Sequence, residues 1–324
     1  MALAAVRVEG LCRLAGGASR EIWAFGAEID GPGGTRVYDL VMRRDPPGRD
    51  DEGGRDLEFR VVRAAGEAGV PVPQVHWCCT DPAVLGTTFY VMDRVDGEAL
   101  PRRLLRDARY EKTRAVLTGQ LGAILARIHA VDPDQPALAG LSDATAGTVS
   151  SALAEIDRVS EGIRGLAAEP HPTLTLAERW LRARAPEGSR RALVHGDYRV
   201  GNVLFDEDGA RAILDWELCK IGDPVEDLGW LCARPWRFGS PLPVGGVGTR
   251  EALVDAYVAA GGAPVDPAHL RFWEAMASYK VALVWIQQSW VYRSGRVPSL
   301  ELAALGRRTA EEEQALLDLM EEQA

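Results

Sequence analysis

The stretch of residues 193–230 constrains the fold of this 324-residue chain more than any other part of the sequence. Two short apolar runs, residues 203–205 and 212–214, are separated there by the polar sequence Asp-Glu-Asp-Gly at 206–209. An Asp-Gly pair between two apolar runs is a strong local signal for a β-hairpin. The stretch therefore predicts two short antiparallel strands whose outer ends lie side by side.

Three polar residues lie before and after this predicted hairpin. Asp197 precedes Asn202 by five positions, and Asp215 follows the second apolar run. A carboxylate can accept the proton of an attacking hydroxyl, and amide and carboxylate oxygens suit Mg²⁺, which can bridge nucleotide phosphates. Each residue alone could be an ordinary turn former. Their order around a hairpin, with the spacing of the catalytic and metal loops of protein kinases, favours phosphoryl transfer.

The sequence resembles the aminoglycoside phosphotransferase and choline kinase family through three linked motifs. They read H-G-D-x-x-x-x-N at 195–202, L-D-W at 214–216 and G-D-P-x-x-D-L at 222–228. Within this family the chain looks most similar to the phosphotransferase domains related to acyl-CoA dehydrogenase fusions. The resemblance implies an α+β, two-lobed protein-kinase-like fold, with a β-rich nucleotide-binding lobe at residues 1–95 and a helical lobe at 96–324 that carries the catalytic loop and the substrate pocket. It also implies that ATP binds between the lobes, that Asp197 is the catalytic base, and that Asn202 and Asp215 bind Mg²⁺.

Two further residues of these motifs are expected to support the site rather than to react. His195 is expected to orient the loop by a hydrogen bond, because a lone loop histidine more often belongs to the scaffold. Asp227 begins an apolar helical run. It could cap that helix, or it could accept backbone N–H groups of the catalytic loop. Asp223 reads first as a turn residue.

A small-residue loop near the N-terminus is expected to cover the nucleotide phosphates. Gly16, Gly17 and Ser19 lie just before a predicted strand. Glycine lets backbone N–H groups approach phosphates closely, and serine adds a hydroxyl donor. A Gly-Gly pair by itself is more often a hairpin turn, but members of the family carry a similar Gly-Gly-x-Ser loop.

The strand at residues 37–44 is expected to supply the cation that holds the α- and β-phosphates in kinase-like folds. Alternation along the strand places Val41 and Arg43 on one face. We therefore assign Val41 to the adenine pocket and Arg43 to the phosphates, with Arg44 pointing away; two solvated arginines are the alternative. The lysines of the chain all lie later in the sequence, at Lys112, Lys220 and Lys280.

Two more segments complete the expected nucleotide site. A helix is predicted at residues 56–68, and by resemblance Glu58 in its first turns pairs with the strand cation. The alternative is an exposed helical glutamate. A further strand at residues 87–95 is expected to run into the hinge between the lobes, where backbone groups meet adenine. The hinge candidates are Met92, Asp93 and Val95.

The second lobe is predicted to be helical. The expected helices cover residues 109–129, 174–184, 250–260, 267–292 and 300–322. Residues 131–173 read as a mixed, partly loop-like insertion, which contributes to substrate binding in aminoglycoside-phosphorylating relatives. Aromatic residues at helical spacing are usually core. We nevertheless take Trp236, Gln288 and Tyr292 as candidates for the substrate pocket.

Composition excludes several classes of function. A net charge of −10 disfavours a general nucleic-acid binder or a basic membrane-surface protein. The cysteines are odd in number and lack zinc-like or redox spacing, which fits reduced thiols in a cytoplasm. The N-terminus does not look like a signal peptide, and no apolar run reaches membrane-spanning length. We therefore expect a cytoplasmic enzyme without nucleic-acid or membrane partners, and no particular oligomeric state is indicated.

The acceptor is expected to be a small molecule with a hydroxyl group. The chain has no Ala-Pro-Glu signature after Asp215 that would build a peptide platform. Aminoglycosides would call for a clustered acidic surface, but the acidic residues of the insertion are interspersed with Arg158 and Arg164. Tryptophans and arginines of the later lobe fit a hydroxylated molecule with an apolar body and an anionic group.

Similar proteins joined to acyl-CoA dehydrogenase-like domains are thought to act on hydroxyacyl compounds, which agrees with this expectation. The alternatives are an aminoglycoside or macrolide antibiotic kinase, and a nucleotide-binding pseudokinase that serves as an interaction module. The intact set of Asp197, Asn202 and Asp215 counts against a pseudokinase.

Overall fold

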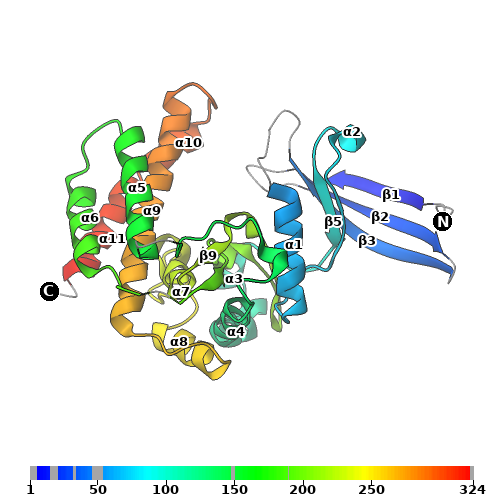
Figure 1. Cartoon of the computed structure of the whole chain (residues 1–324), viewed down its shortest axis with the longest axis horizontal. Coiled ribbons are helices and arrows are strands. Elements are labelled where there is room, and N and C mark those ends of the chain that lie inside the picture. Colours follow the sequence, from blue (N-terminus) through cyan, green and yellow to red (C-terminus); the bar gives the residue numbers. More distant parts are fainter. Residues whose placement is uncertain are drawn as a thin grey trace.

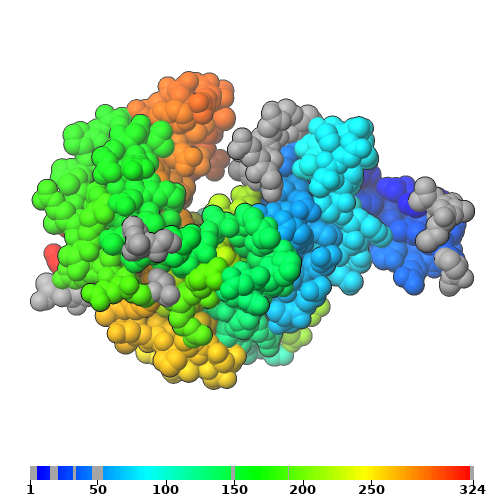
Figure 2. Space-filling view, viewed as in Figure 1, coloured from blue at the N-terminus to red at the C-terminus, as the bar shows by residue number. Residues whose placement is uncertain are grey.

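The computed structural model describes residues 6–14, 21–31, 34–45, 54–146, 150–188 and 190–321. They form an antiparallel sheet lobe and a larger, mostly helical lobe (Figure 1). The predicted α+β, two-lobed kinase-like architecture is confirmed. In the space-filling view the surface is hollowed between the sheet lobe and the green and orange helices of the second lobe (Figure 2).

The sheet of the first lobe has five strands in the order β1-β2-β3-β5-β4, and every pairing is antiparallel. Strands β2 and β3 pair along their whole length as a hairpin. The register of this pairing fixes the face of the sheet on which each side chain lies. The strands are β1 (Val6–Arg13), β2 (Glu21–Gly31), β3 (Gly34–Arg44), β4 (Val75–Cys79) and β5 (Phe89–Asp93).

Helix α1 (Gly54–Glu67) lies between the sheet and the helical lobe (Figure 1). Its inward face is apolar: Val61, Val62 and Ala65 are buried. These side chains belong to the main apolar core, which also contains the helices of the second lobe. A short helix, α2 (Pro82–Leu85), connects β4 to β5. Because α1 contacts β4, β5 and the second lobe, it sets the position of the sheet relative to the helical lobe.

The helical lobe is built around α4 (Glu111–His129) and α9 (Pro267–Arg293). Leu117, Leu121 and Leu125 of α4 are fully buried at helical spacing, as the sequence pattern predicts. Around these two helices lie α3 (Pro101–Arg106), α5 (Ser151–Leu166), α6 (Pro172–Arg184), α7 (Val225–Cys232), α8 (Arg250–Ala259), α10 (Leu300–Gly306) and α11 (Thr309–Glu321). Among the residues described, no helix is both long and apolar enough to cross a membrane.

Residues 131–173, expected to be a mixed, partly loop-like insertion, contain the whole of α5, whose start is capped by the Ser150 side chain. The polar residues Glu155 and Ser160 are buried on its inner face and break the apolar pattern. The expectation of a single terminal helix at 300–322 was wrong, because α10 ends at Gly306 and α11 begins at Thr309. Gly306 packs closely on α9, where a side chain would collide with Ser289.

Two glycines one turn apart in α4 test how closely α4 packs against α8. A Cβ at Gly122 would lie 2.7 Å from the Leu253 carbonyl oxygen of α8, whereas a Cβ at Gly119 would meet nothing within 4 Å. We expect Gly122→Ala to lower the free energy of unfolding by about 1–3 kcal/mol, because the backbones must separate. Gly119→Ala should raise it by about 0.5–1 kcal/mol. Urea unfolding monitored by circular dichroism measures both, and equal effects would contradict the close α4–α8 contact.

Candidate functional site

The catalytic-loop segment follows β6 (Ala192–Val194), which pairs with β9 (Lys220–Gly222). Gly196 has a φ of 80°, and a Cβ there would lie 2.3 Å from the Leu218 carbonyl oxygen. Only glycine fits this left-handed turn against the neighbouring chain. A short 3₁₀ turn, η3 (Val200–Asn202), then leads into the hairpin.

Asp197 is held by donors on both carboxylate oxygens. Trp230 Nε1 donates to Asp197 Oδ1 at 2.9 Å, and Asn202 Nδ2 donates to Oδ2 at 2.7 Å. Arg199 Nε lies 3.0 Å from Oδ1 and 3.1 Å from Oδ2. These donors therefore fix the orientation of the carboxylate.

The predicted hairpin is formed by β7 (Val203–Asp206) and β8 (Gly209–Ile213). The Leu214 N–H donates to the Asn202 carbonyl at 2.8 Å, so the residue before Asp215 is tied to Asn202. Asp215 itself has a φ of 69°, a left-handed conformation that a short polar side chain tolerates best. As the hairpin register predicts, Asp197, Asn202 and Asp215 come together.

Arg43 joins the sheet lobe to this cluster. Its Nη2 donates to Asp215 Oδ1 at 2.5 Å, and its Nη1 lies 3.3 Å from Glu58 Oε1. Tyr90 Oη donates to the same Glu58 oxygen at 3.0 Å. Arg44 faces the other side of the strand, where its Nε donates to Glu21 at 2.7 Å. Strand alternation thus places Arg43 inward and Arg44 outward.

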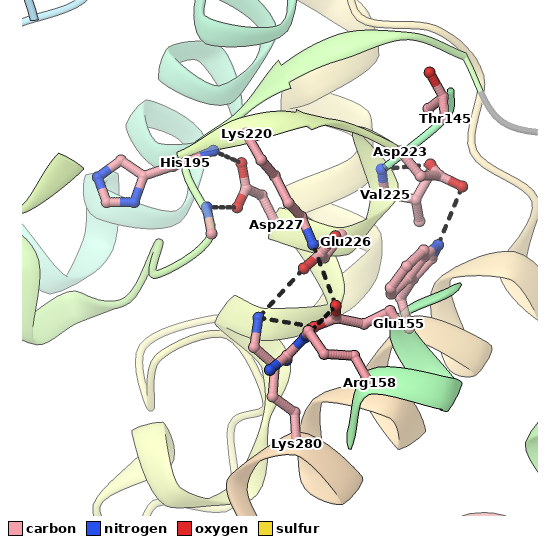
Figure 3. Close-up of polar contacts among 12 residues, drawn as sticks. Thr145, Glu155, Arg158, His195, Lys220, Asp223, Val225, Glu226, Asp227 and Lys280 are labelled. Carbon is pink, nitrogen blue, oxygen red and sulfur yellow. Dashed lines mark hydrogen bonds and ion pairs between the residues drawn. The ribbon is translucent and has the colours of Figure 1, made fainter. Parts of the chain in front are cut away.

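Asp227 supports the catalytic loop by accepting hydrogen bonds from its backbone (Figure 3). Its fully buried carboxylate accepts the N–H of His195 at 2.8 Å and the N–H of Gly196 at 2.9 Å. His129 Nε2 lies 3.2 Å away. Although burial raises the pKa of Asp227, the His129 contact and the loop N–H groups outweigh it and lower the pKa. Of the two roles expected for Asp227, these contacts fit support of the loop; Asp223 instead accepts from the start of α7 at Val225 N.

His195 connects the two halves of the site. Its Nε2 lies 3.1 Å from the Leu214 carbonyl oxygen, and the Asp197 N–H donates to its Nδ1 at 3.2 Å. The ring is fully buried, and burial lowers the pKa of His195. A neutral imidazole with Nε2 protonated satisfies both contacts. His195 therefore links the catalytic loop to the segment that carries Asp215.

A network of charges surrounds the buried Glu155 and Glu226 (Figure 3). Lys220 Nζ lies 2.9 Å from Glu226, and Lys280 Nζ lies 3.3 Å from Glu155 and 3.4 Å from Glu226. Arg158 donates twice to Glu155. Burial opposes charge on Lys220, but the two glutamates raise its pKa. The network therefore holds three cations and two anions.

Trp230 connects this network to Asp197. Lys280 Nζ lies 5.0 Å from the centre of the Trp230 ring, while the ring N–H donates to Asp197. Neither Arg199, Trp230 nor Lys280 was predicted from the sequence. The position of Arg199, two residues after Asp197, was a local signal for its role. Trp230 and Lys280 are distant in sequence from the loop, and only the packing of α7 against α9 brings them near it.

The structure describes some of the residues expected to bind the nucleotide. Gly16, Gly17 and Ser19 lie outside the described residues. Val41 is buried in β3 and pairs with Met92 of β5. The remaining hinge candidates are Asp93, whose N–H donates to the Gln74 carbonyl and whose carboxylate contacts His76, and the partly exposed Val95. Because its N–H is already bonded, Asp93 cannot offer that donor to adenine as expected.

Two cavities are lined by neighbours of Trp230: Lys280 lines one and Trp236 lines the other. The α5 cavity has a volume of about 500 Å³ and is lined by α5, β9 and α9, including Lys220 and Lys280. The α11 cavity has about 610 Å³ and lies between α11, α9 and the turn η5 (Arg234–Arg237). Trp236 lines the α11 cavity, but Gln288 and Tyr292 line neither, although both are partly exposed on α9.

The donor set fits a magnesium ion. Asn202 turns its amide nitrogen toward Asp197, which leaves its side-chain oxygen as a hard ligand. The Asp215 carboxylate is one-third exposed and is neutralised by Arg43. Two oxygen ligands completed by phosphate oxygens and water are usual for Mg²⁺ in nucleotide sites. Asn202 and Asp215 are therefore the residues that would hold it.

Comparisons with known proteins agree with this geometry. A model of the phosphotransferase enzyme family matches residues 10–273. The Arabidopsis thaliana protein named probable acyl-CoA dehydrogenase IBR3 is 30% identical over 282 residues, which are 78% of this chain and 33% of that protein. Mouse acyl-CoA dehydrogenase family member 11 is 28% identical over 268 residues, 77% of this chain and 33% of its own. The chain thus spans about a third of the length of these curated relatives.

Solved structures show the same fold. A provisionally named aminoglycoside phosphotransferase from Ralstonia eutropha superposes with a TM-score of 0.76 at 24% identity, covering 97% of this chain and 92% of its own. A choline/ethanolamine kinase family protein from Mesorhizobium loti gives 0.64 at 21% identity, covering 96% and 88%. Aminoglycoside phosphotransferase APH(4)-Ia, in a ternary complex with AMP-PNP and hygromycin B, gives 0.60 at 18% identity, covering 95% and 94%.

Asp227→Asn tests the support of the loop. The substitution places an amide nitrogen against one of two backbone donors, so we expect a loss of about 2–4 kcal/mol in the free energy of unfolding at pH 7. Because the pKa of Asp227 is lowered in the fold, its contribution is complete above the unfolded pKa of about 3.9 and is lost as the pH falls through the folded value. The difference from wild type, measured by urea unfolding, should therefore shrink at acid pH.

Asp134→Asn is the matched control, because Asp134 is exposed and its ion pair within the described residues is with the surface residue Arg191. It should change the free energy of unfolding by less than about 1 kcal/mol. An Asp227→Asn protein as stable as this control would contradict the supporting role.

Proposed function

The chain belongs to the phosphotransferase enzyme family, and on that premise we propose that it transfers the γ-phosphoryl group of ATP, with Mg²⁺, to a hydroxyl group of a small molecule. The observation that carries this proposal is the convergence of Asp197, Asn202 and Asp215, with Arg43 bound to Asp215. The fold class and family are established by the comparisons. The nucleotide, the metal and the acceptor are our inference.

In this proposal Asp197 accepts the proton of the acceptor hydroxyl. Its two oxygens are both occupied by donors, so the hydroxyl must replace one of them. Arg199 is the donor best able to leave, because its side chain is partly exposed and rests on the Trp236 ring at 4.9 Å. Once displaced, its guanidinium can stabilise charge on the transferring phosphoryl group. Trp230 and Asn202 then keep the carboxylate aligned.

Arg43 is proposed to contact the nucleotide phosphates. Its Nε is buried without a hydrogen-bond partner, while its other nitrogens contact Glu58 and Asp215. A phosphate oxygen would satisfy that atom. Bound Mg²⁺ would neutralise charge on the phosphates and orient them. Gly16, Gly17 and Ser19 are proposed to cover the phosphates, and Val41, Met92 and Val95 to border adenine.

Nucleotide use is supported by the related structures. APH(4)-Ia was solved with AMP-PNP, and an aminoglycoside 2'-phosphotransferase of the same fold was solved with GDP. The latter shares a TM-score of 0.63 with this chain at 16% identity. Both ligands are purine nucleotides, so a purine site between the lobes is the simplest interpretation for this chain.

The acceptor is proposed to be a hydroxyacyl compound. The curated relatives carry acyl-CoA dehydrogenase names, and this chain corresponds to about a third of them. The α5 cavity next to the loop contains the excess of cations formed by Arg158, Lys220 and Lys280. Such a surface favours an acceptor with an anionic group.

The same charges disfavour an aminoglycoside. Several acidic residues of the 131–173 segment are paired with arginines of the protein: Asp134 and Asp143 with Arg191, Asp157 with Arg182, and Glu155 with Arg158. A polycation would meet paired carboxylates and two partly buried lysines rather than an open acidic surface. An aminoglycoside or macrolide kinase, and a pseudokinase, remain the alternatives that the following experiment separates.

Phosphate transfer to an acceptor panel tests the function. ATP and Mg²⁺ are incubated with hydroxyacyl-CoA thioesters, hydroxy acids, choline, kanamycin and a macrolide, and phosphorylated products are detected by mass spectrometry. We expect phosphorylation of hydroxyacyl compounds. Asp197→Asn should fold normally and lower turnover by about 10² or more, because a positioned base is lost. Phosphorylation of kanamycin with no hydroxyacyl product would overturn the acceptor, and no product from any hydroxyl compound would favour a pseudokinase.

A second prediction concerns the metal ligand. If Asp215 holds Mg²⁺, Asp215→Ala should abolish the additional rise in Tm that Mg²⁺ produces in the presence of ATP, because ligand binding stabilises the folded state by mass action. Asp208→Ala in the exposed hairpin turn is the matched control and should retain the rise. An unchanged Mg²⁺-dependent rise in Asp215→Ala would assign the metal to other residues.

A further inference from the structure

Arg199 covers the exposed side of the Asp197 carboxylate. Its Nε donates to both carboxylate oxygens, at 3.0 Å to Oδ1 and at 3.1 Å to Oδ2. The other two donors to this carboxylate, Trp230 and Asn202, are buried. The Arg199 side chain is 26% exposed, whereas that of Asp197 is 14% exposed. A small molecule that approaches Asp197 from solvent therefore meets the guanidinium group of Arg199.

A second contact keeps the Arg199 side chain in this position. Its guanidinium carbon lies 4.9 Å from the centre of the Trp236 ring. A cation over the face of a tryptophan ring is attracted by the ring electrons. Trp236 in turn packs against Trp230, with 5.5 Å between the ring centres. Because the guanidinium binds both a carboxylate and an aromatic ring, it lies over Asp197 instead of extending into solvent.

Gly201 leaves the space that this guanidinium occupies. A Cβ added at Gly201 would collide with Arg199 Nη1, and Pro101 Cγ of α3 would be 3.9 Å away. Gly201 does not have a positive φ, so its backbone conformation is open to alanine. A glycine at this position therefore provides room for the Arg199 side chain rather than an unusual backbone conformation.

Water and an acceptor differ in their ability to displace Arg199. In the proposed transfer the acceptor oxygen bonds to the γ-phosphorus of ATP, the bond from that phosphorus to the β,γ-bridging oxygen breaks, and Asp197 takes the hydroxyl proton. Water can react in the same way and would yield ADP and inorganic phosphate. An acceptor has further atoms whose binding offsets the contacts that Arg199 loses, whereas water has none.

We propose that Arg199 determines the choice between acceptor and water, because it closes Asp197 to water until an acceptor displaces it. This inference rests on the proposed function and deepens it. When no acceptor is bound, the contact between Arg199 and Asp197 protects ATP from hydrolysis. When an acceptor binds, its hydroxyl takes the position of the Arg199 N–H at the carboxylate.

Two substitutions open the carboxylate in different ways. Arg199→Ala removes the guanidinium, whereas Gly201→Ala displaces it and keeps its charge. The full chain is incubated with ATP and Mg²⁺ without an acceptor, and the release of ADP and inorganic phosphate is measured. We expect both variants to hydrolyse ATP about tenfold faster than wild type, the change that loss of one charge-assisted hydrogen bond makes in an equilibrium. Impaired folding cannot produce such a gain.

Matched controls separate this effect from general changes in the protein. Gly165→Ala in α5, where a Cβ would meet nothing within 4 Å, should hydrolyse ATP as wild type does. The same is expected of Arg102→Ala, which removes an exposed arginine of α3. Adding Asp197→Asn to Gly201→Ala should abolish the gain, because the water then lacks its base.

Gly201→Ala is the decisive variant, because it keeps the guanidinium in the protein. Hydrolysis by this variant at the wild-type rate or below would overturn the role of Arg199, while phosphorylation of an acceptor by wild type would leave the proposed function intact. A gain that persists with Asp197→Asn would also overturn this role. Faster hydrolysis that depends on Asp197, with no phosphorylation of any hydroxyl compound, would instead overturn the proposed function and leave the exclusion of water by Arg199 standing.

Discussion

The buried carboxylate of Asp227 is the interaction on which the site depends. It accepts two consecutive backbone N–H groups of the catalytic loop, at His195 and Gly196. Without an acceptor, two buried donors would be unpaired beneath the reacting residue. Because Asp227 fixes the loop, the His195 ring can contact the Leu214 carbonyl oxygen. The loop then holds Asp197 next to the hairpin that carries Asp215. One carboxylate thereby sets the geometry of two motifs.

Cations from both lobes balance the acidic residues of the site. Arg43 crosses from the sheet to Asp215, and Lys280 lies against Trp230, which donates to Asp197. Buried charges are tolerated only when they are paired, and both cations have carboxylate partners. The position of the sheet lobe is consequently coupled to the electrostatics of the proposed metal site. If Arg43 moved with the sheet, its positive charge would no longer lie next to the Asp215 carboxylate.

Sequence patterns predicted most of the fold because most elements carry a local signal. The apolar stripe of α4, the Asp-Gly hairpin and the alternation of β3 each depend on residues close together in the chain. The pattern did not reveal α5, because its buried face includes Glu155 and Ser160, whose partners Lys280 and Tyr279 lie on α9. It was wrong for the last helix, which is divided into α10 and α11.

The sequence by itself determined the family, the two-lobed fold and the grouping of Asp197, Asn202 and Asp215, because these residues are linked by short spacings across a single hairpin. Tertiary structure alone decided what surrounds them. Trp230 and Lys280 reach the site from distant elements, and Trp236, Ser278 and Glu312 line one cavity only through the packing of α9 and α11. The physical reason is that buried charges and polar groups are completed by partners far away in sequence, and one sequence contains no local trace of that pairing.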